Sequence, residues 1–164
     1  MRDKLYMRLA LALANKAYLL GEIPVGAVMV AEDNVIAWGY NEKELRHDAT
    51  AHAEILTLQR AALSSGRWRQ EDATLYTTLE PCAMCAGAMV NARLGTLVYG
   101  AGDSKAGACG SVLDIVRHPA LNHQVQVKPG ILAEECGDLI KQFFAELRRA
   151  REDKADCKSS GTIV

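Results

Sequence analysis

Apolar residues recur at helical spacing over residues 5–20, the first patterned segment of the chain. Leu5, Leu9 and Leu13 lie four positions apart and would share one face of a helix. Gly21 follows directly, and glycine is the residue that most easily adopts the left-handed conformation that ends many helices. The pattern therefore predicts an N-terminal helix that ends before Gly21.

Two short runs rich in β-branched and aromatic residues come next, at 25–30 and 35–40. Runs of this kind, bounded by polar and small residues, are typical of strands. The polar and small residues at 31–34 separate the two runs. We therefore expect a β-hairpin with a four-residue turn.

The remainder of the chain alternates between helical and strand patterns, with a loop of glycine and small residues at 101–111. Helices are expected at 52–64, 81–93, 112–116 and 133–151, and strands at 73–78, 96–99 and 125–127. Strands joined through helices run parallel, whereas the two strands of a hairpin run antiparallel. The order predicts an α/β fold in which a five-stranded mixed sheet lies between helices, giving three α/β/α layers.

Length and composition are those of a single globular domain. The 164 residues carry a formal net charge of −1, with 49% hydrophobic and 24% charged residues, close to the average for globular chains. These values exclude a collagen-like fibre, a disulfide miniprotein and a disordered charged protein. We expect one domain over residues 1–153 and a disordered tail over 154–164. The near-neutral total argues against binding nucleic acid by overall charge, and leaves a local basic strip possible.

The apolar runs are too short for a membrane-spanning helix, which needs about 18 apolar residues. The run at 9–14 is also shorter than the apolar region of a secretory signal, about 7–15 residues. The cysteines number five, an odd count, in a chain long enough to bury its own core, which indicates a reducing compartment. The expected location is the cytoplasm, with no membrane partner.

Two short segments carry candidate chemistry: His52-Ala53-Glu54 and Pro81-Cys82-Ala83-Met84-Cys85. Cys82 and Cys85 stand three positions apart at the start of a helix, so both sulfurs project from one face, and the helix N-terminus favours thiolates. With His52 they form a three-ligand set for zinc. Such sets leave a fourth position for water, as is typical of catalytic rather than structural zinc.

Glu54 is a candidate general acid–base, because a carboxylate beside an activated water can take its proton and return it to a leaving group. Two positions on an ideal helix correspond to about 200° of rotation, which would point His52 and Glu54 apart. The pair works only if it occupies the first helical turn, for which Thr50 is a candidate N-cap. We expect both metal-binding helices to direct their N-termini at one cavity.

Each motif taken alone has a simpler interpretation. His52 and Glu54 could be surface or helix-end residues, and Cys82 and Cys85 could be a redox pair or two buried cysteines. Together, however, they reproduce the pattern H-x-E followed by P-C-x-x-C, which is a signature of zinc-dependent deaminases. The redox interpretation leaves His52 and Glu54 without a role, so we favour a zinc hydrolase.

Further segments accompany the zinc motifs: EIPVGAV at 22–28, RHD at 46–48, TAHAE at 50–54, TTLEPC at 77–82, CAGAM at 85–89, DSK at 103–105, HP at 118–119, NH at 122–123, GILA at 130–133 and FF at 143–144. Over about residues 5–150 the chain resembles the bacterial tRNA-specific adenosine deaminases. The resemblance implies the cytidine deaminase-like fold of that superfamily. It also implies hydrolytic deamination of adenosine to inosine at the wobble position of tRNA anticodons.

The resemblance further implies a role for individual residues. His52, Cys82 and Cys85 would bind one Zn²⁺ per subunit, and Glu54 would move the proton. The positions that would contact substrate are Asn41 and the backbone of Ala53 at the flipped nucleotide, and Asp103, Lys105, Asn122, His123 and Phe144 in a groove for the anticodon loop. The expected partners are the tRNA anticodon stem-loop and a second copy of the chain in a homodimer.

Two other functions remain open from the sequence. The same zinc chemistry would serve a deaminase of free bases or nucleosides, such as guanine or cytidine. A binding module that is stabilised by zinc and has no catalytic activity would also keep the three metal ligands. The sequence leaves open which tRNA is the substrate, and whether Cys109 or Phe144 contacts it.

Overall fold

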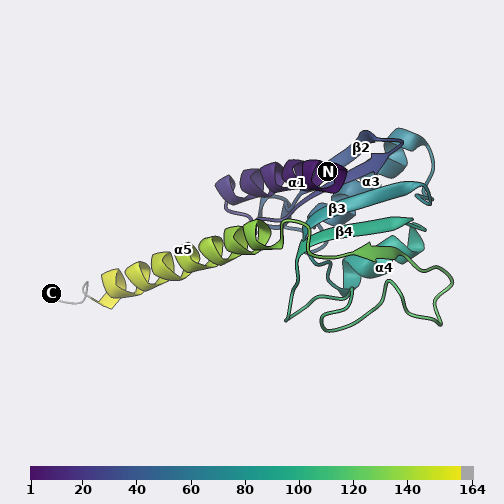
Figure 1. The fold of residues 1–164 in the computed structure, drawn as a ribbon. Helices are drawn as coiled ribbons and strands as arrows, with labels where there is room; N and C mark the ends of the chain where they lie inside the picture. The colour runs from purple at the N-terminus through teal and green to yellow at the C-terminus, as the bar shows by residue number, and fades with distance from the viewer. Residues whose placement is uncertain (160–164) are drawn as a thin grey trace.

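The computed structural model describes residues 1–159, with their side chains as far as residue 153. A five-stranded sheet in the order β2-β1-β3-β4-β5 forms the middle layer (Figure 1). The strands are β1 (Gly26–Ala31), β2 (Asn34–Tyr40), β3 (Ala73–Leu79), β4 (Thr96–Ala101) and β5 (Gln126–Lys128). The helices are α1 (Arg2–Leu19), α2 (Lys43–Arg46), α3 (Ala53–Ser65), α4 (Ala83–Asn91) and α5 (Ala133–Ser159).

The sheet is mixed, as the sequence predicts. Strand β1 pairs antiparallel with both β2 and β3, whereas β3–β4 and β4–β5 are parallel. Helices α1 and α5 pack on one face of the sheet, and α3 and α4 pack on the other (Figure 1). The three-layer α/β/α architecture is therefore confirmed, and the C-terminal end of β3 leads directly into α4.

Each face of the sheet carries its own apolar core. On the α3–α4 face, Met29, Leu75 and Leu97 are fully buried, and on the α1–α5 face Met7 and Val98 are. Alternate residues of the same strands supply both cores, because successive side chains of a strand point to opposite faces. The sheet is thus held rigidly on both sides, which fixes the strand ends from which the candidate site is built.

The hairpin turn is shorter than expected. Ala31 pairs with Asn34, so only Glu32 and Asp33 form the turn, with φ values of 49° and 61°. Two consecutive residues in the left-handed region form the type I′ turn, whose twist matches that of the paired strands. The expectation of a four-residue turn at 31–34 is therefore wrong. The shorter turn was not predicted because the sequence lacks the glycine that usually marks it.

Two other expectations about local structure are wrong. Residues 112–116 are irregular instead of helical, because the N–H groups of Val112 and Leu113 both donate to the carbonyl oxygen of Gly107, and Cys109 forms a β-bridge with Asp114. The polar segment after β2 contains a short helix, α2, that the pattern did not predict. The carboxylate of Glu22, distant in sequence, accepts the N–H of Leu45 and so stabilises α2.

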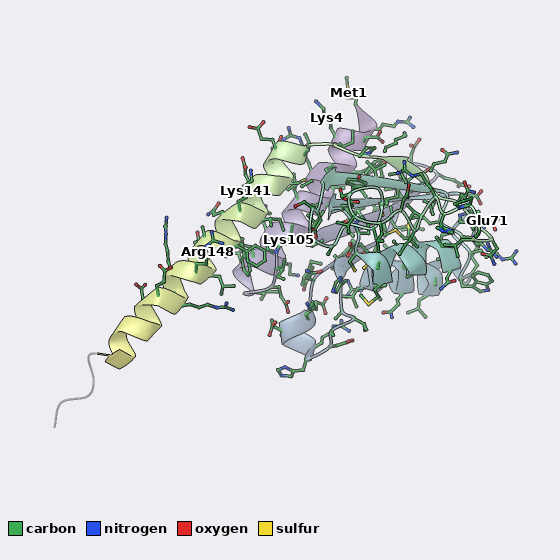
Figure 2. The ribbon with its side chains drawn as sticks, turned by 90° about the horizontal axis from the view of Figure 1, so that it is seen from below. Met1, Lys4, Glu71, Lys105, Lys141 and Arg148 are labelled. Atoms are coloured by element: carbon green, nitrogen blue, oxygen red, sulfur yellow. The ribbon has the colours of Figure 1, made fainter. Side chains whose placement is uncertain are left out.

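Helix α5 continues beyond the expected end at 151 and reaches Ser159. Its first part packs against β4, and the remainder projects away from the body of the molecule (Figure 1). Figure 2 shows Lys141 and Arg148 along this helix, both exposed. Of the expected tail over 154–164, residues 154–159 therefore belong to a helix, and residues 160–164 lie outside the described part of the chain.

Within residues 1–159, no helix combines the length and the apolar character that a membrane crossing requires.

Candidate active site

The first turns of α3 and α4 lie side by side and carry the candidate metal ligands. His52 is the N-cap of α3, with φ −77° and ψ 149°, and Cys82 is the N-cap of α4, with φ −72° and ψ 173°. Extended backbone at an N-cap directs the side chain ahead of the helix instead of around it. Thr50 is not the N-cap that we expected: its N–H and hydroxyl both bond to Asp48.

This geometry removes the difficulty that His52 and Glu54 would point apart. Because His52 precedes the first helical residue, the rotation of an ideal helix does not separate it from Glu54. Both side chains line one cavity in front of the helix ends. The expectation that the two metal-binding helices direct their N-termini at one cavity is confirmed.

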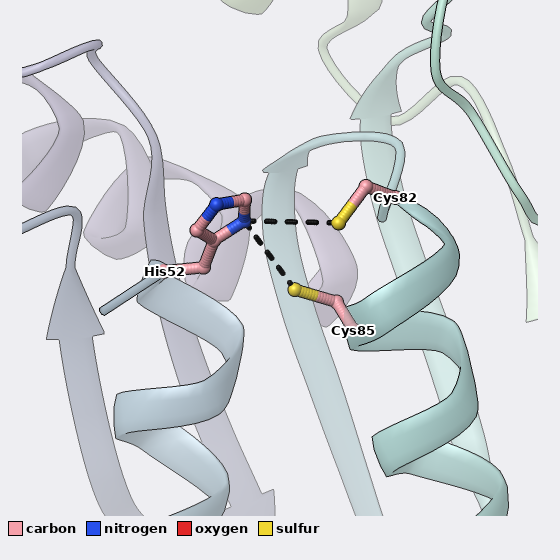
Figure 3. A group of neighbouring side chains, drawn as sticks. All are labelled: His52, Cys82 and Cys85. Carbon is pink, nitrogen blue, oxygen red and sulfur yellow. Dashed lines mark hydrogen bonds between the residues drawn. The ribbon is translucent and has the colours of Figure 1, made fainter. Parts of the chain in front are cut away.

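The three candidate ligands form a compact cluster (Figure 3). His52 Nδ1 lies 3.7 Å from Cys82 Sγ and 3.6 Å from Cys85 Sγ, and all three atoms fall within 4.8 Å of one another. A tetrahedral zinc ion with usual bond lengths separates a nitrogen ligand from a sulfur ligand by about 3.5 Å. One imidazole and two sulfurs at these separations fit a zinc ion.

The pKa shifts within the cluster favour the metal-binding form at one of the three candidate ligands, Cys82. Hydrogen bonds from Cys85 and from His52 lower the pKa of the Cys82 thiol to about 3. The shared hydrogen bond with Cys82, together with burial, raises the pKa of Cys85, and the bond to Cys82 raises that of His52. The lowered pKa favours the thiolate form of Cys82, which is the form that binds metals. The raised pKa values of Cys85 and His52 favour protonated forms, so these two residues must release their protons when a metal binds.

Glu54 lies beside this cluster and is 4% exposed. Its Oε2 atom has no hydrogen-bond partner among the described residues, and burial raises the pKa of its carboxyl group. A buried polar atom without a partner destabilises a fold, so its presence needs an explanation. An unpartnered carboxylate oxygen in a cavity next to metal ligands is available to accept and donate a proton.

The cavity has a volume of about 160 Å³, and a cavity of roughly 150 Å³ is large enough for benzene. Besides His52, Glu54 and Cys82, its wall consists of Ile23, Val25, Asn41, Lys43, Leu79, Glu80, Asp103 and Ala106. Polar and apolar residues both line the cavity, but most of the surface that they present to it is apolar. An apolar surface with several polar groups is typical of a binding site for a small ring compound. One flat base would fit it.

Asn41 and Asp103, two of the expected substrate contacts, belong to this wall. Asn41 is 4% exposed, and its Oδ1 accepts the N–H of Ala53 at 2.9 Å while its Nδ2 donates to the carbonyl oxygen of Ile23. The Ala53 N–H is thus already bonded within the chain. Asn41 joins the start of β1 to the start of α3, so it also positions the segment that carries Glu54.

The other expected contacts lie outside the cavity wall. Lys105 is exposed, and Phe144 on α5 is 36% exposed. Asn122 accepts two hydrogen bonds from Arg93, and His123 donates to the carbonyl oxygen of Leu94, which places both residues beside the segment that joins α4 to β4. The structure does not bring these four residues together around the metal cluster.

Two charged residues of the wall, Lys43 and Glu80, were not predicted as site residues from the sequence. Lys43 follows Asn41 by two positions in a polar segment, and only its place in the short helix α2 brings it to the cavity. Glu80 directly precedes Pro81 and Cys82. An acidic residue directly before a metal motif is a signal in the sequence that could have found it.

Comparisons with known proteins agree on one family. Residues 1–148 match the family described as MafB19-like deaminase. The chain is 44% identical to a tRNA-specific adenosine deaminase of Bacillus subtilis (strain 168), over 92% of this chain and 94% of that protein. It is 46% identical to a protein of the same name from Haemophilus influenzae, over 96% of this chain and 92% of that protein.

Similar solved structures are deaminases as well. A structure from a study of A-to-I editing by tRNA:A34 deaminases at the wobble position of transfer RNA superposes with a TM-score of 0.79 and 40% identity, over 82% of this chain and 97% of that chain. A guanine deaminase from Nitrosomonas europaea superposes with a TM-score of 0.72 and 25% identity, over 87% of this chain and 84% of that chain. Both similarities extend over most of the fold.

Proposed function

This chain belongs to the tRNA-specific adenosine deaminases, and from that premise we propose that it converts adenosine to inosine at the wobble position of tRNA anticodons. The observation that carries the proposal is the meeting of two features in one cavity. The cluster of His52, Cys82 and Cys85 lies beside the unpartnered carboxylate of Glu54. Redox chemistry or structural metal binding alone would give that carboxylate no role.

We assign zinc to the cluster, one ion per subunit, held by His52 Nδ1 and by the sulfurs of Cys82 and Cys85. Two sulfurs and one imidazole nitrogen are a usual zinc ligand set, and three protein ligands are typical of catalytic sites. When bound, zinc lowers the pKa of water and so supplies a nucleophile at neutral pH.

Glu54 moves the protons of the reaction. Deamination adds water at C6 of adenine and breaks the bond from C6 to the exocyclic nitrogen, releasing inosine and ammonia. The Glu54 carboxylate takes one proton from the attacking water and donates it to N1 of the ring. It then takes the second proton from the oxygen now bonded to C6 and donates it to the leaving nitrogen. Its burial and its free Oε2 atom suit this role, since no competing hydrogen bond holds the oxygen within residues 1–159.

The adenine base enters the cavity after it flips out of the anticodon loop. Asn41 contacts the nucleotide, because it lines the cavity. The Ala53 backbone assists by holding Asn41 in place, since the Ala53 N–H donates to Asn41 Oδ1. Asp103 contacts the substrate from the opposing loop. Lys105 and Phe144 are exposed, and we assign both of them, with Asn122 and His123, to contacts with the rest of the anticodon loop.

We also propose a homodimer that forms through the outer face of α3 and α4. A shallow apolar groove on this face is lined by Ile55, Leu58, Gln59, Ala62, Trp68, Ala88, Asn91 and Ala92. Trp68 in it is 56% exposed, and exposed apolar patches mark interaction sites. The protein works in the cytoplasm, where its tRNA substrate is made and used.

The dimer predicts a solution mass of about two chains. Replacing Ala88 with glutamate places a charge in the groove, so we expect the variant to sediment as a monomer, because burying an unpaired charge opposes association. Analytical ultracentrifugation of both proteins tests this. A wild-type protein that sediments as one chain at micromolar concentration contradicts the dimer.

The function is tested by incubating the zinc-loaded protein with a set of tRNA transcripts and sequencing the products. Inosine is read as guanosine, so a tRNA whose anticodon begins with adenosine is expected to show A-to-G reads at that position. The same transcripts incubated without the protein are the control, and they should keep A reads at that position. Unchanged tRNA, together with ammonia release from free guanine or cytidine, would favour the alternative of a small-molecule deaminase, which the Nitrosomonas guanine deaminase exemplifies.

A further inference from the structure

A buried carboxylate outside the proton-transfer machinery lies at the edge of the metal motif. Glu80 is the last residue before Pro81 and Cys82, and its side chain is 2% exposed. It accepts four hydrogen bonds. They come from the N–H groups of Asp103, Cys109 and Ser111, each at 3.0 Å, and from the Ser111 hydroxyl.

All four donors belong to one loop, residues 103–111, which we call the wall loop. Oε1 of Glu80 accepts the N–H groups of Cys109 and Ser111, and Oε2 accepts that of Asp103 and the Ser111 hydroxyl. The hydrogen bonds therefore hold both ends of the wall loop in place. A carboxylate suits this position because it offers acceptor sites only, whereas a glutamine side chain would turn an NH₂ group against an N–H donor.

The loop is shaped to receive this carboxylate. At Gly107, an added Cβ would lie 2.5 Å from the Glu80 carboxyl carbon and 2.5 Å from the carbonyl oxygen of Asp103. Only glycine leaves room for the carboxylate inside the loop. Gly107 also forms a β-bridge with Cys82, and the N–H of Ala108 donates to the carbonyl oxygen of Pro81.

The wall loop supplies Asp103 and Ala106 to the wall of the catalytic cavity. Glu80 thus connects the segment that ends in the metal ligand Cys82 to the loop that faces the base. We propose that Glu80 is a positioning residue for deamination, whose carboxylate fixes the wall loop at the distance from the metal ligands that the substrate base requires. This inference rests on the proposed function, and it adds the residue that sets the dimensions of the cavity.

The inference is tested with the zinc-loaded Glu80→Gln variant in two measurements. In hydrogen exchange, the wall-loop amides, including those of Asp103, Cys109 and Ser111, are expected to exchange at least about tenfold faster than in the wild type, while β3 and β4 keep their protection. In steady-state kinetics on tRNA, KM is expected to rise about 10- to 100-fold, because a misplaced wall weakens contact with the base. Zinc content should stay at one ion per chain.

Two further variants separate positioning from general loss of stability. Gly107→Ala disturbs the contact with the Glu80 carboxyl group from the side of the loop. This variant should also raise KM. Tyr76→Phe is the matched control, because Tyr76 is buried on the opposite face of the sheet and loses one hydrogen bond, to Asp3. A variant that is merely less stable has fewer active molecules, so its apparent kcat falls while its KM stays the same.

If Glu80→Gln does not fold, Ser111→Ala removes one of the four bonds and should give a smaller change in the same two measurements. Unchanged exchange in the wall loop of either variant would overturn the inference, as would a loss confined to kcat with KM unaltered. The exchange measurement does not depend on the reaction. A wild-type protein that leaves tRNA unchanged would therefore refute the proposed function and leave the position of the loop still testable.

Discussion

Glu54→Gln is expected to lower kcat for tRNA deamination by about 10²- to 10⁴-fold, which is the usual contribution of a general acid–base residue. Glutamine keeps the size and shape of the side chain, so the cavity and the neighbouring metal ligands stay in place. What the variant loses is the ability to accept and return a proton. Single-turnover kinetics with saturating enzyme measure this change directly, because they isolate the chemical step from product release.

The stability of the Glu54→Gln protein is expected to stay the same or to rise, although its kcat falls. Oε2 of Glu54 has no hydrogen-bond partner within the described part of the chain, so the substitution breaks no bond at that atom and removes a buried carboxylate. The unfolding temperature is expected to equal or exceed that of the wild type. Substitutions that remove a destabilising group from an active site commonly have this effect. Glu71→Gln, at an exposed residue far from the site, is the control and should leave kcat unchanged. A Glu54→Gln variant with a kcat close to that of the wild type would refute the assigned role.

Cys85→Ser is expected to remove the metal and the activity together. Zinc content should fall from about one ion per chain to less than about one-tenth, because a hydroxyl is a poor replacement for a thiolate ligand. Turnover should fall below detection. Elemental analysis of the purified variant and the tRNA sequencing assay measure the two effects.

Cys136→Ala is the matched control for that experiment. Cys136 is as buried as Cys85, but it lies in the core between the sheet and the α1–α5 layer. Its loss should lower the unfolding temperature by leaving a small cavity, while zinc content and kcat stay at the wild-type values. Full zinc content in Cys85→Ser would show that the ion binds elsewhere.

The sequence predicts the sheet and the clustering of the candidate metal ligands well, because both depend on local signals. Alternating apolar runs mark the strands, and the spacing of Cys82 and Cys85 on a first helical turn brings their sulfurs together whatever surrounds them. The placement of His52 with Glu54 depends on a single backbone feature, the extended conformation of His52 at the N-cap. Periodicity alone predicts that the two side chains diverge.

What the sequence does not predict depends on contacts between distant residues. The short helix α2 is stabilised by Glu22, 23 positions before Leu45, and the irregular course of 112–116 is set by bonds to Gly107. The wall of the cavity also depends on contacts between residues that are distant in the sequence. Glu80 and the loop that it holds are 23 to 31 positions apart, and no periodic pattern records such a contact.

X-ray absorption at the zinc edge, on the zinc-loaded protein, tests most directly the claim that catalysis depends on the cluster in front of α3 and α4. For the wild type we predict one zinc ion per chain, with two sulfur ligands and one imidazole nitrogen from the protein. Any zinc that remains in the Cys85→Ser variant should have one sulfur ligand fewer. A fourth protein ligand, or a zinc environment without sulfur, would contradict the account.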